Sequence, residues 1–226
     1  GEIYNFKELK ENLKKNGVNF KTESDTEVLL YGFIHEGKSF LNKLNGFFAC
    51  CFYDSIKDKS ILARDRFGIK PLYYWFNGDT ICFASEIKAI IKHPDYKMDI
   101  DLSALNEYFS FQNVFSFNTL FKGVTMLPPA NTVKIDASTT FVKHESWWDY
   151  NFTKTDENIS FDEATKETRR LFKQAVTRQM ISDVPVGSFL SGVDNQVLPY
   201  IHQSLKCHNE GIMPSFDVQM NFFNVY

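Results

Sequence analysis

The chain has 226 residues, of which 43% are hydrophobic and 23% charged, a composition that excludes intrinsic disorder. Its 25 basic and 28 acidic residues give a net charge of −3, so the basic surplus typical of duplex nucleic-acid binders is absent. No apolar run reaches the length needed to span a bilayer. We therefore expect neither a nucleic-acid nor a membrane partner.

Helix signals open the chain. Asn5 with Glu8, and again Ser24 with Glu27, have the spacing of a capping box. Apolar residues at helical spacing follow each cap: Phe6, Leu9 and Leu13, then Val28, Tyr31 and Ile34. Gly17 is expected to end the first helix.

After these helices, the spacing of the apolar residues changes to the pattern that is typical of strands. Asn77-Gly78 lies between two β-forming runs, and this dipeptide tolerates the positive φ of a tight hairpin turn. We expect short helices over 87–91 and 101–111, the first ending near Pro94. Strands are expected at 47–53, 60–63, 71–76, 80–84, 131–135 and 140–143.

Cysteine and histidine usage indicates no metal site. Cys50, Cys51 and Cys82 lie in apolar strand-like runs and are expected to be buried, inert thiols. Neither they nor Cys207 form a CxxC pair, and the five histidines show no ligand spacing. With no signal peptide visible, we expect a reduced, cytoplasmic protein.

The organisation changes near residue 149. A polar linker over 149–159 follows an α+β region over 1–148. Ser160 and Glu163 form another capping box ahead of the longest apolar helical stripe of the chain. Residues 160–226 are therefore expected to be the truncated start of an α/β domain, too short to close a core alone.

A strand-to-turn segment over 186–194 ends in a Ser/Gly turn that could expose backbone N–H groups to a phosphate. The GxxxxGK[ST] pattern of a Walker loop is absent. On these residues alone, an ordinary turn between a strand and a helix is the favoured interpretation.

Seven segments in register carry a resemblance to a known family. They are GEIYN at 1–5, SDTEVLL at 24–30, LNG at 44–46, ARDRFGIKPLYY at 63–74, ASEIKA at 84–89, LPP at 127–129 and SDVPVG at 182–187. Their order and spacing resemble the glutamine-hydrolysing asparagine synthetase family, from residue 1 to about residue 194.

The resemblance implies an α+β N-terminal-nucleophile sandwich of the class II glutamine amidotransferase type, incomplete at its N-terminus. The beginning of an α/β adenine-nucleotide-binding synthetase domain would follow. In the family, an N-terminal Cys hydrolyses L-glutamine, and the ammonia passes to an L-aspartate β-carboxylate activated by ATP and Mg²⁺. The products are asparagine, AMP and pyrophosphate, and a homodimer is compatible with the resemblance.

Three residues match the family's glutamine pocket. The resemblance implies that the Gly1 backbone N–H contributes to the oxyanion hole, that Glu2 lies in the pocket, and that Asp25 holds the substrate α-ammonium. The structural alternative for Asp25 is an acid stabilised by the dipole at a helix N-terminus. Arg64, Asp65 and Arg66 are interpreted as an ion-pair cluster shaping the pocket wall, and Glu86 is expected to be a buried or half-buried partner.

Four residues fall on the family's pyrophosphate-binding loop: Leu190, Ser191, Gly192 and Asp194. The family pattern is Ser-Gly-Gly-hydrophobic-Asp-Ser-Ser, whereas this chain reads SGVDNQ at 191–196, without one Gly and both trailing serines. Fewer donors then face the pyrophosphate, so we expect weak ATP binding or none.

The resemblance places the nucleophilic Cys upstream of residue 1, so this chain alone is expected to be inactive. Two alternatives stay open. One is a related amidotransferase that acts on another carboxylate, and the other is a non-catalytic truncated member that acts as a binding or scaffold protein.

Overall fold

The computed structural model describes residues 1–136, 141–153 and 159–181, and the chain divides into two units, Gly1–Asn151 and Phe152–Tyr226. The helices of the first unit are α1 (Phe6–Lys15), α2 (Asp25–Glu36), the 3₁₀ helix η1 (Gly37–Lys43), α3 (Ile87–Ile90) and α4 (Leu102–Phe111). Its strands are β1 (Glu2–Ile3), β2 (Gly46–Phe47), β3 (Ala49–Asp54), β4 (Lys59–Arg64), β5 (Tyr73–Phe76), β6 (Ile81–Ala84), β7 (Val124–Met126), β8 (Asn131–Asp136) and β9 (Phe141–Ser146).

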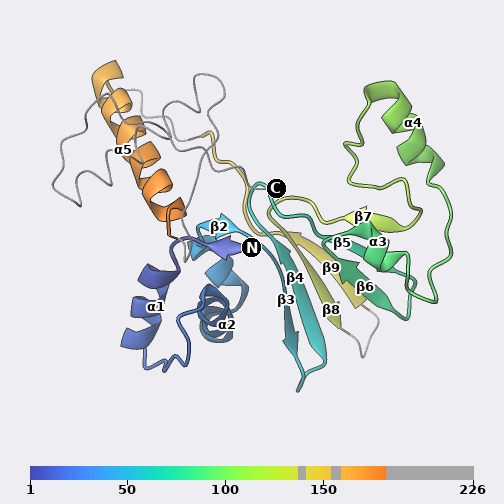
Figure 1. Cartoon of the computed structure of the whole chain (residues 1–226), viewed down its shortest axis with the longest axis horizontal. Coiled ribbons are helices and arrows are strands. Elements are labelled where there is room, and N and C mark those ends of the chain that lie inside the picture. The colour runs from blue at the N-terminus through green and yellow to red at the C-terminus, as the bar shows by residue number, and fades with distance from the viewer. Residues whose placement is uncertain (137–140, 154–158, 182–226) are drawn as a thin grey trace, which may run out of the picture. The chain divides into compact units, whose positions relative to one another are not determined.

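The described strands of the first unit form three antiparallel sheets (Figure 1). A two-stranded ribbon joins β1 and β2, a four-stranded sheet has the order β3-β4-β8-β9, and a three-stranded sheet has the order β6-β5-β7. A hairpin joins β5 and β6 as expected, with Phe76 opposite Ile81, and Gly78 takes the positive φ of its turn. The three-residue strand β7 was missed because so short a segment shows no alternation.

Consecutive strand residues show how the layers pack. Side chains alternate between the two faces of a strand. Leu62 is buried against Tyr74 of the other sheet, whereas its neighbour Ala63 is buried with the helical residues of α1, α2 and η1. In the same way Tyr74 lies between the sheets and Trp75 packs with Ile90 of α3. The order is therefore helices, sheet, sheet, helix, which confirms the expected α+β sandwich.

The helix ends follow the local signals in part. The Ser24 side chain caps α2 by accepting the Thr26 N–H at 3.2 Å, as expected. Glu27 does not complete a capping box, because its carboxylate accepts the N–H groups of Lys21 and Thr22 instead. Val28 is fully buried, but the expected stripe is wrong at Ile34, which is 64% exposed.

The described part of the second unit holds one helix, α5 (Phe161–Gln179). Its N-terminus has the expected capping box: the Ser160 hydroxyl accepts the Glu163 N–H, and the Glu163 carboxylate accepts the Ser160 N–H. Among the described residues, no helix is long and apolar enough to cross a membrane.

Candidate functional site

Gly1 and Glu2 lie where β1 runs against β2, beside the N-terminus marked in Figure 1. Glu2 is opposite Phe47 and Ile3 is opposite Gly46. A Cβ atom at Gly46 would lie 2.1 Å from the Glu2 carbonyl oxygen, and one at Gly1 would lie 2.6 Å from that of Phe47. Both positions therefore require glycine, since any side chain would force the two backbones apart.

Asp25 is the first residue of α2, and its carboxylate lies beside β1. The Asp25 Oδ2 atom accepts the backbone N–H of Ile3 at 3.0 Å, and Oδ1 accepts the Thr26 hydroxyl at 3.3 Å. The structure thus brings Asp25 next to the Glu2–Ile3 backbone, 22 residues earlier in the chain. A carboxylate offers about four lone-pair positions, so further donors can still be accepted.

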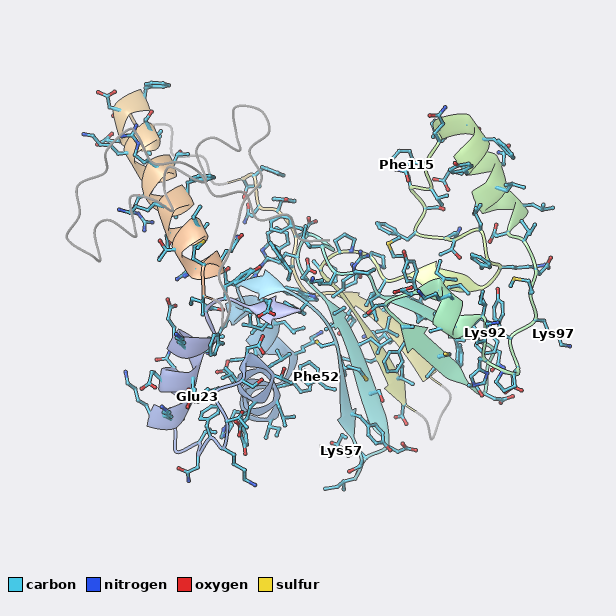
Figure 2. The ribbon with its side chains drawn as sticks, viewed as in Figure 1. Glu23, Phe52, Lys57, Lys92, Lys97 and Phe115 are labelled. Carbon is cyan, nitrogen blue, oxygen red and sulfur yellow. The ribbon has the colours of Figure 1, made fainter. Side chains whose placement is uncertain are left out.

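The loop before Asp25 is fixed from both sides. Lys10 is buried, and its Nζ atom donates to the Thr22 carbonyl at 2.7 Å and pairs with Glu23 at 2.9 Å (Glu23 is labelled in Figure 2). From α2, the Glu27 carboxylate accepts the Thr22 N–H at 2.7 Å. These contacts hold the start of α2, and with it Asp25, against α1.

The Asn5 side chain bonds to a distant loop and does not cap α1 as expected. Its side chain makes no cap hydrogen bond. It donates instead to the Lys43 carbonyl and accepts the Asn45 N–H, both at 2.9 Å. The expected capping box at Asn5 and Glu8 is therefore wrong, and Asn5 fixes the end of β1 to the segment that leads into β2.

Asp65 is fully buried and organises the backbone around it. Its carboxylate accepts four backbone N–H groups at 3.0 to 3.3 Å, from Phe48, Phe67, Ile69 and Lys70. Its own N–H donates to the Phe48 carbonyl at 2.9 Å. Because Phe48 directly follows β2, Asp65 sets the position of the strand that pairs with Glu2 and Ile3.

The two neighbouring arginines also bind backbone groups. Arg64 donates to the carbonyls of Lys70, at 2.8 Å, of Gly68, at 2.6 Å, and of Leu127. Arg66 donates to the carbonyls of Asn42, at 2.6 Å, and of Leu44. Burial lowers the pKa of both guanidinium groups. The structural interpretation of these residues holds, but the expected ion-pair cluster is wrong, because each side chain binds carbonyls or amides.

An aromatic group surrounds Arg66. Its guanidinium lies 5.2 Å from the centre of the Trp147 ring and 5.7 Å from that of Trp148. The Trp147 Nε1 atom donates to the Arg64 carbonyl at 3.2 Å. Sequence reasoning missed this role because Trp147 and Trp148 lie far along the chain from the half-buried Arg66, so no local pattern links them.

The described cysteines offer no activated thiol. Burial raises the pKa of Cys50 to about 12 and also raises that of Cys82. Cys51 is exposed, so its expected burial is wrong; it lies on β3, the edge strand of the four-stranded sheet. Cys51 lines a groove of about 840 Å³ between α2 and the β3–β4 hairpin, which Gly1, Glu2 and Asp25 do not reach.

Two other expectations concern charge and nucleotide binding. Glu86 was expected to be buried or half-buried, but its side chain is 61% exposed and pairs with Lys88. Its position at the start of α3 places it in solvent.

The residues expected to bind nucleotide, Leu190, Ser191, Gly192 and Asp194, lie outside the described residues.

Two family models match the chain. Residues 1–148 match the model of a glutamine amidotransferase domain, and residues 167–194 match that of asparagine synthase.

Curated relatives agree with these matches. The glutamine-hydrolyzing asparagine synthetase 3 of Bacillus subtilis (strain 168) is 40% identical over 195 residues, which cover 85% of this chain and 31% of the relative. Asparagine synthetase 1 of the same organism is 39% identical over 220 residues, covering 93% and 34%. The chain thus spans about a third of the length of these relatives.

Among solved structures, a glutamine phosphoribosylpyrophosphate amidotransferase from B. subtilis, in complex with ADP and GMP, is similar at 20% identity. The match covers 93% of this chain and 42% of that one, with a TM-score of 0.43. A likeness at this level adds nothing to the family matches.

Proposed function

Because the chain belongs to the glutamine amidotransferase domain family, we propose that residues 1–148 form a pocket for L-glutamine. The observation that carries the proposal is the 3.0 Å hydrogen bond from Ile3 to Asp25, which brings a carboxylate to the strand that holds Gly1 and Glu2. An oxyanion donor and an ammonium acceptor at neighbouring positions are what recognition of an α-amino acid amide requires.

In this proposal each pocket residue has one role. The Asp25 carboxylate accepts the α-ammonium of glutamine, and Glu2 lines the pocket. The Gly1 backbone N–H donates to the oxygen of the side-chain amide as negative charge develops on it. A cysteine thiolate forms a bond to the amide carbon, the carbon–nitrogen bond breaks, and the nitrogen takes up the proton lost by the thiol and leaves as ammonia. Water then hydrolyses the thioester to glutamate and restores the thiol.

The attacking thiol belongs to none of the described cysteines. Cys50 and Cys82 have raised pKa values, and Cys51 lines the separate groove beside α2. The family resemblance implies a cysteine upstream of Gly1, and the proposal assigns this step to it.

For a full-length protein that contains this chain, we propose glutamine-dependent asparagine synthesis in the cytoplasm. In this reaction the first domain supplies ammonia to an ATP-activated aspartate. The names of the curated relatives and the asparagine synthase match at 167–194 support this. The proposal includes the division at 1–148, 149–159 and 160–226, a homodimer, and ATP with Mg²⁺ as cofactors. Because the sequence at 191–196 lacks one glycine and both trailing serines of the family pattern, a second candidate is a non-catalytic chain that binds glutamine without using ATP.

Direct binding tests the pocket without needing the nucleophile. L-glutamine and 4-carbamoylbutanoate, which lacks only the α-amino group, would be titrated into the chain by calorimetry. Wild type should prefer glutamine by roughly tenfold to a hundredfold, the range for a charge-assisted hydrogen bond. Asp25→Asn should abolish this preference, since the amide can still accept the Ile3 N–H but no longer carries a charge.

Asp79→Asn, on the exposed turn between β5 and β6, is the matched control and should keep the preference. Equal binding of both ligands by wild type, or an unchanged preference in Asp25→Asn, would remove the role assigned to Asp25. Loss of the preference in both variants would show a nonspecific effect of charge and would count against the proposal.

A further inference from the structure

Lys10 of α1 is a buried cation to which the proposed pocket gives no part. It is 3% exposed, and its neighbours Leu9 and Leu13 on the same helix belong to the core that α1 shares with α2. Removal of an ammonium group from water is costly, so lysine is rarely buried unless its charge is compensated. An apolar side chain would fill this position without that cost. The charge of Lys10 therefore needs an explanation beyond packing.

The compensation comes from the loop that precedes Asp25. The Lys10 Nζ atom donates to the Thr22 carbonyl at 2.7 Å and lies 5.1 Å from the centre of the Phe20 ring. Its ion pair with Glu23, at 2.9 Å, adds less, because the Glu23 side chain (labelled in Figure 2) is 93% exposed and water screens the pair. The Thr22 carbonyl is thus the main partner of the buried charge, supported by a cation–π contact.

Thr22 is bonded from both helices. Lys10 of α1 binds its carbonyl, and the Glu27 carboxylate of α2 accepts its N–H at 2.7 Å and its hydroxyl at 2.6 Å. The Lys21 N–H also donates to Glu27, at 2.9 Å. Movement of this loop would break bonds to both helices and leave the buried ammonium without its carbonyl. The backbone just before Asp25 is therefore held by α1 and α2 together.

We propose that Lys10 is a positioning residue for the glutamine pocket, a role that rests on the function proposed for Asp25. The Asp25 carboxylate has to accept the Ile3 N–H and still direct an oxygen toward the substrate α-ammonium, which requires a fixed backbone orientation. A group that is already oriented binds its ligand without the entropic cost of ordering. Lys10 supplies this order through the loop over 21–24, and so strengthens recognition of the α-ammonium without contacting glutamine.

A purely structural role for Lys10 predicts a different result. If Lys10 served stability alone, its loss would lower the folded fraction, and the apparent affinities for L-glutamine and 4-carbamoylbutanoate would fall together. If Lys10 positions Asp25, the loss falls on the ligand that carries the α-ammonium. The ratio of the two dissociation constants therefore separates the two roles.

The first test measures this ratio by calorimetry for Lys10→Met, which keeps a long apolar side chain and removes the donors. The preference for L-glutamine should fall by about fivefold or more, because the charge-assisted contact with Asp25 is no longer oriented. Lys10→Arg keeps charged donors on a long stem and should stay within about threefold of wild type. Lys14→Met is the matched control, since Lys14 lies on the same helix and pairs with Glu11 at 2.8 Å, and it should keep the preference.

A second measurement on the wild type makes the result independent of how the variants fold. In the chain without glutamine, the N–H groups of Lys21 and Thr22 should exchange with solvent roughly a hundredfold more slowly than in an unfolded peptide, since both donate to Glu27. The loop would then be ordered before glutamine binds, as a positioning role requires.

The outcomes separate the role of Lys10 from that of Asp25. If wild type prefers glutamine and Lys10→Met keeps that preference, the role of Lys10 is overturned and the pocket stands. Loss of the preference in Lys14→Met or in Lys10→Arg, or exchange of the Lys21 and Thr22 N–H groups at the unfolded rate, would also overturn it. Equal binding of both ligands by wild type would overturn the roles of Asp25 and Lys10 together.

Discussion

The Asp25 carboxylate accepts the backbone N–H of Ile3 at 3.0 Å and so joins the start of α2 to β1. Ile3 is almost fully buried, so its N–H would otherwise find no water in place of this acceptor. One side chain therefore both positions the strand that carries Gly1 and Glu2 and provides the acceptor proposed for the substrate ammonium.

The structural part of this role predicts different stabilities for two substitutions. Asp25→Ala leaves the Ile3 N–H without an acceptor and should lower the free energy of unfolding by roughly 1–3 kcal/mol. Asp25→Asn keeps an acceptor oxygen and should lower the free energy of unfolding by clearly less. Urea unfolding followed by circular dichroism measures both. Equal losses in the two variants would contradict the hydrogen bond as the cause.

Substitution of Asp65 should be the more damaging change. Asp65→Ala would leave four backbone N–H groups near a fully buried position without their acceptor, and we expect a loss of at least about 3 kcal/mol. Asp79→Ala, on an exposed turn, should be nearly neutral. The comparison is made by urea unfolding, and a neutral Asp65→Ala would refute the organising role.

Gly32 of α2 should not tolerate a methyl group. A Cβ atom there would lie 2.1 Å from the ring of Phe40, which is itself buried. We expect Gly32→Ala to destabilise the chain by roughly 1–3 kcal/mol despite its better helix propensity. His35→Ala, exposed on the same helix, is the control. A gain of thermal stability in Gly32→Ala would show that Phe40 can move aside.

Glu145 should make stability sensitive to acid. Lys143, Lys38 and Lys134 surround its carboxylate and lower its pKa from 4.5 to about 2. The unfolded chain then binds the proton more readily, so the stabilisation is complete above about pH 5 and is lost as pH falls from 4.5 to 2.

The corresponding experiment compares wild type with Glu145→Gln between pH 7 and pH 2. The difference in unfolding free energy should shrink to nothing across the lower part of this range, and added salt should reduce it at neutral pH. A difference that stays constant with pH would exclude the three lysines as its source.

The sequence by itself determined the elements whose signals are local. The Ser24 and Ser160 caps and the Asn77-Gly78 hairpin depend on residues a few positions apart, and each appears in the structure. The resemblance to the family also rests on short segments in a fixed order, and the match over residues 1–148 confirms it.

The tertiary structure alone decided which partners the polar side chains find. Asn5 bonds to residues 38 and 40 positions away, Arg64 to a carbonyl 63 positions away, and Asp25 to a strand 22 positions earlier. Local spacing suggested caps and ion pairs for the first two because it contains no information on which distant backbone groups are left without partners. Burial makes such groups costly unless they are bonded, so the folded chain, and not the local sequence, assigns these side chains.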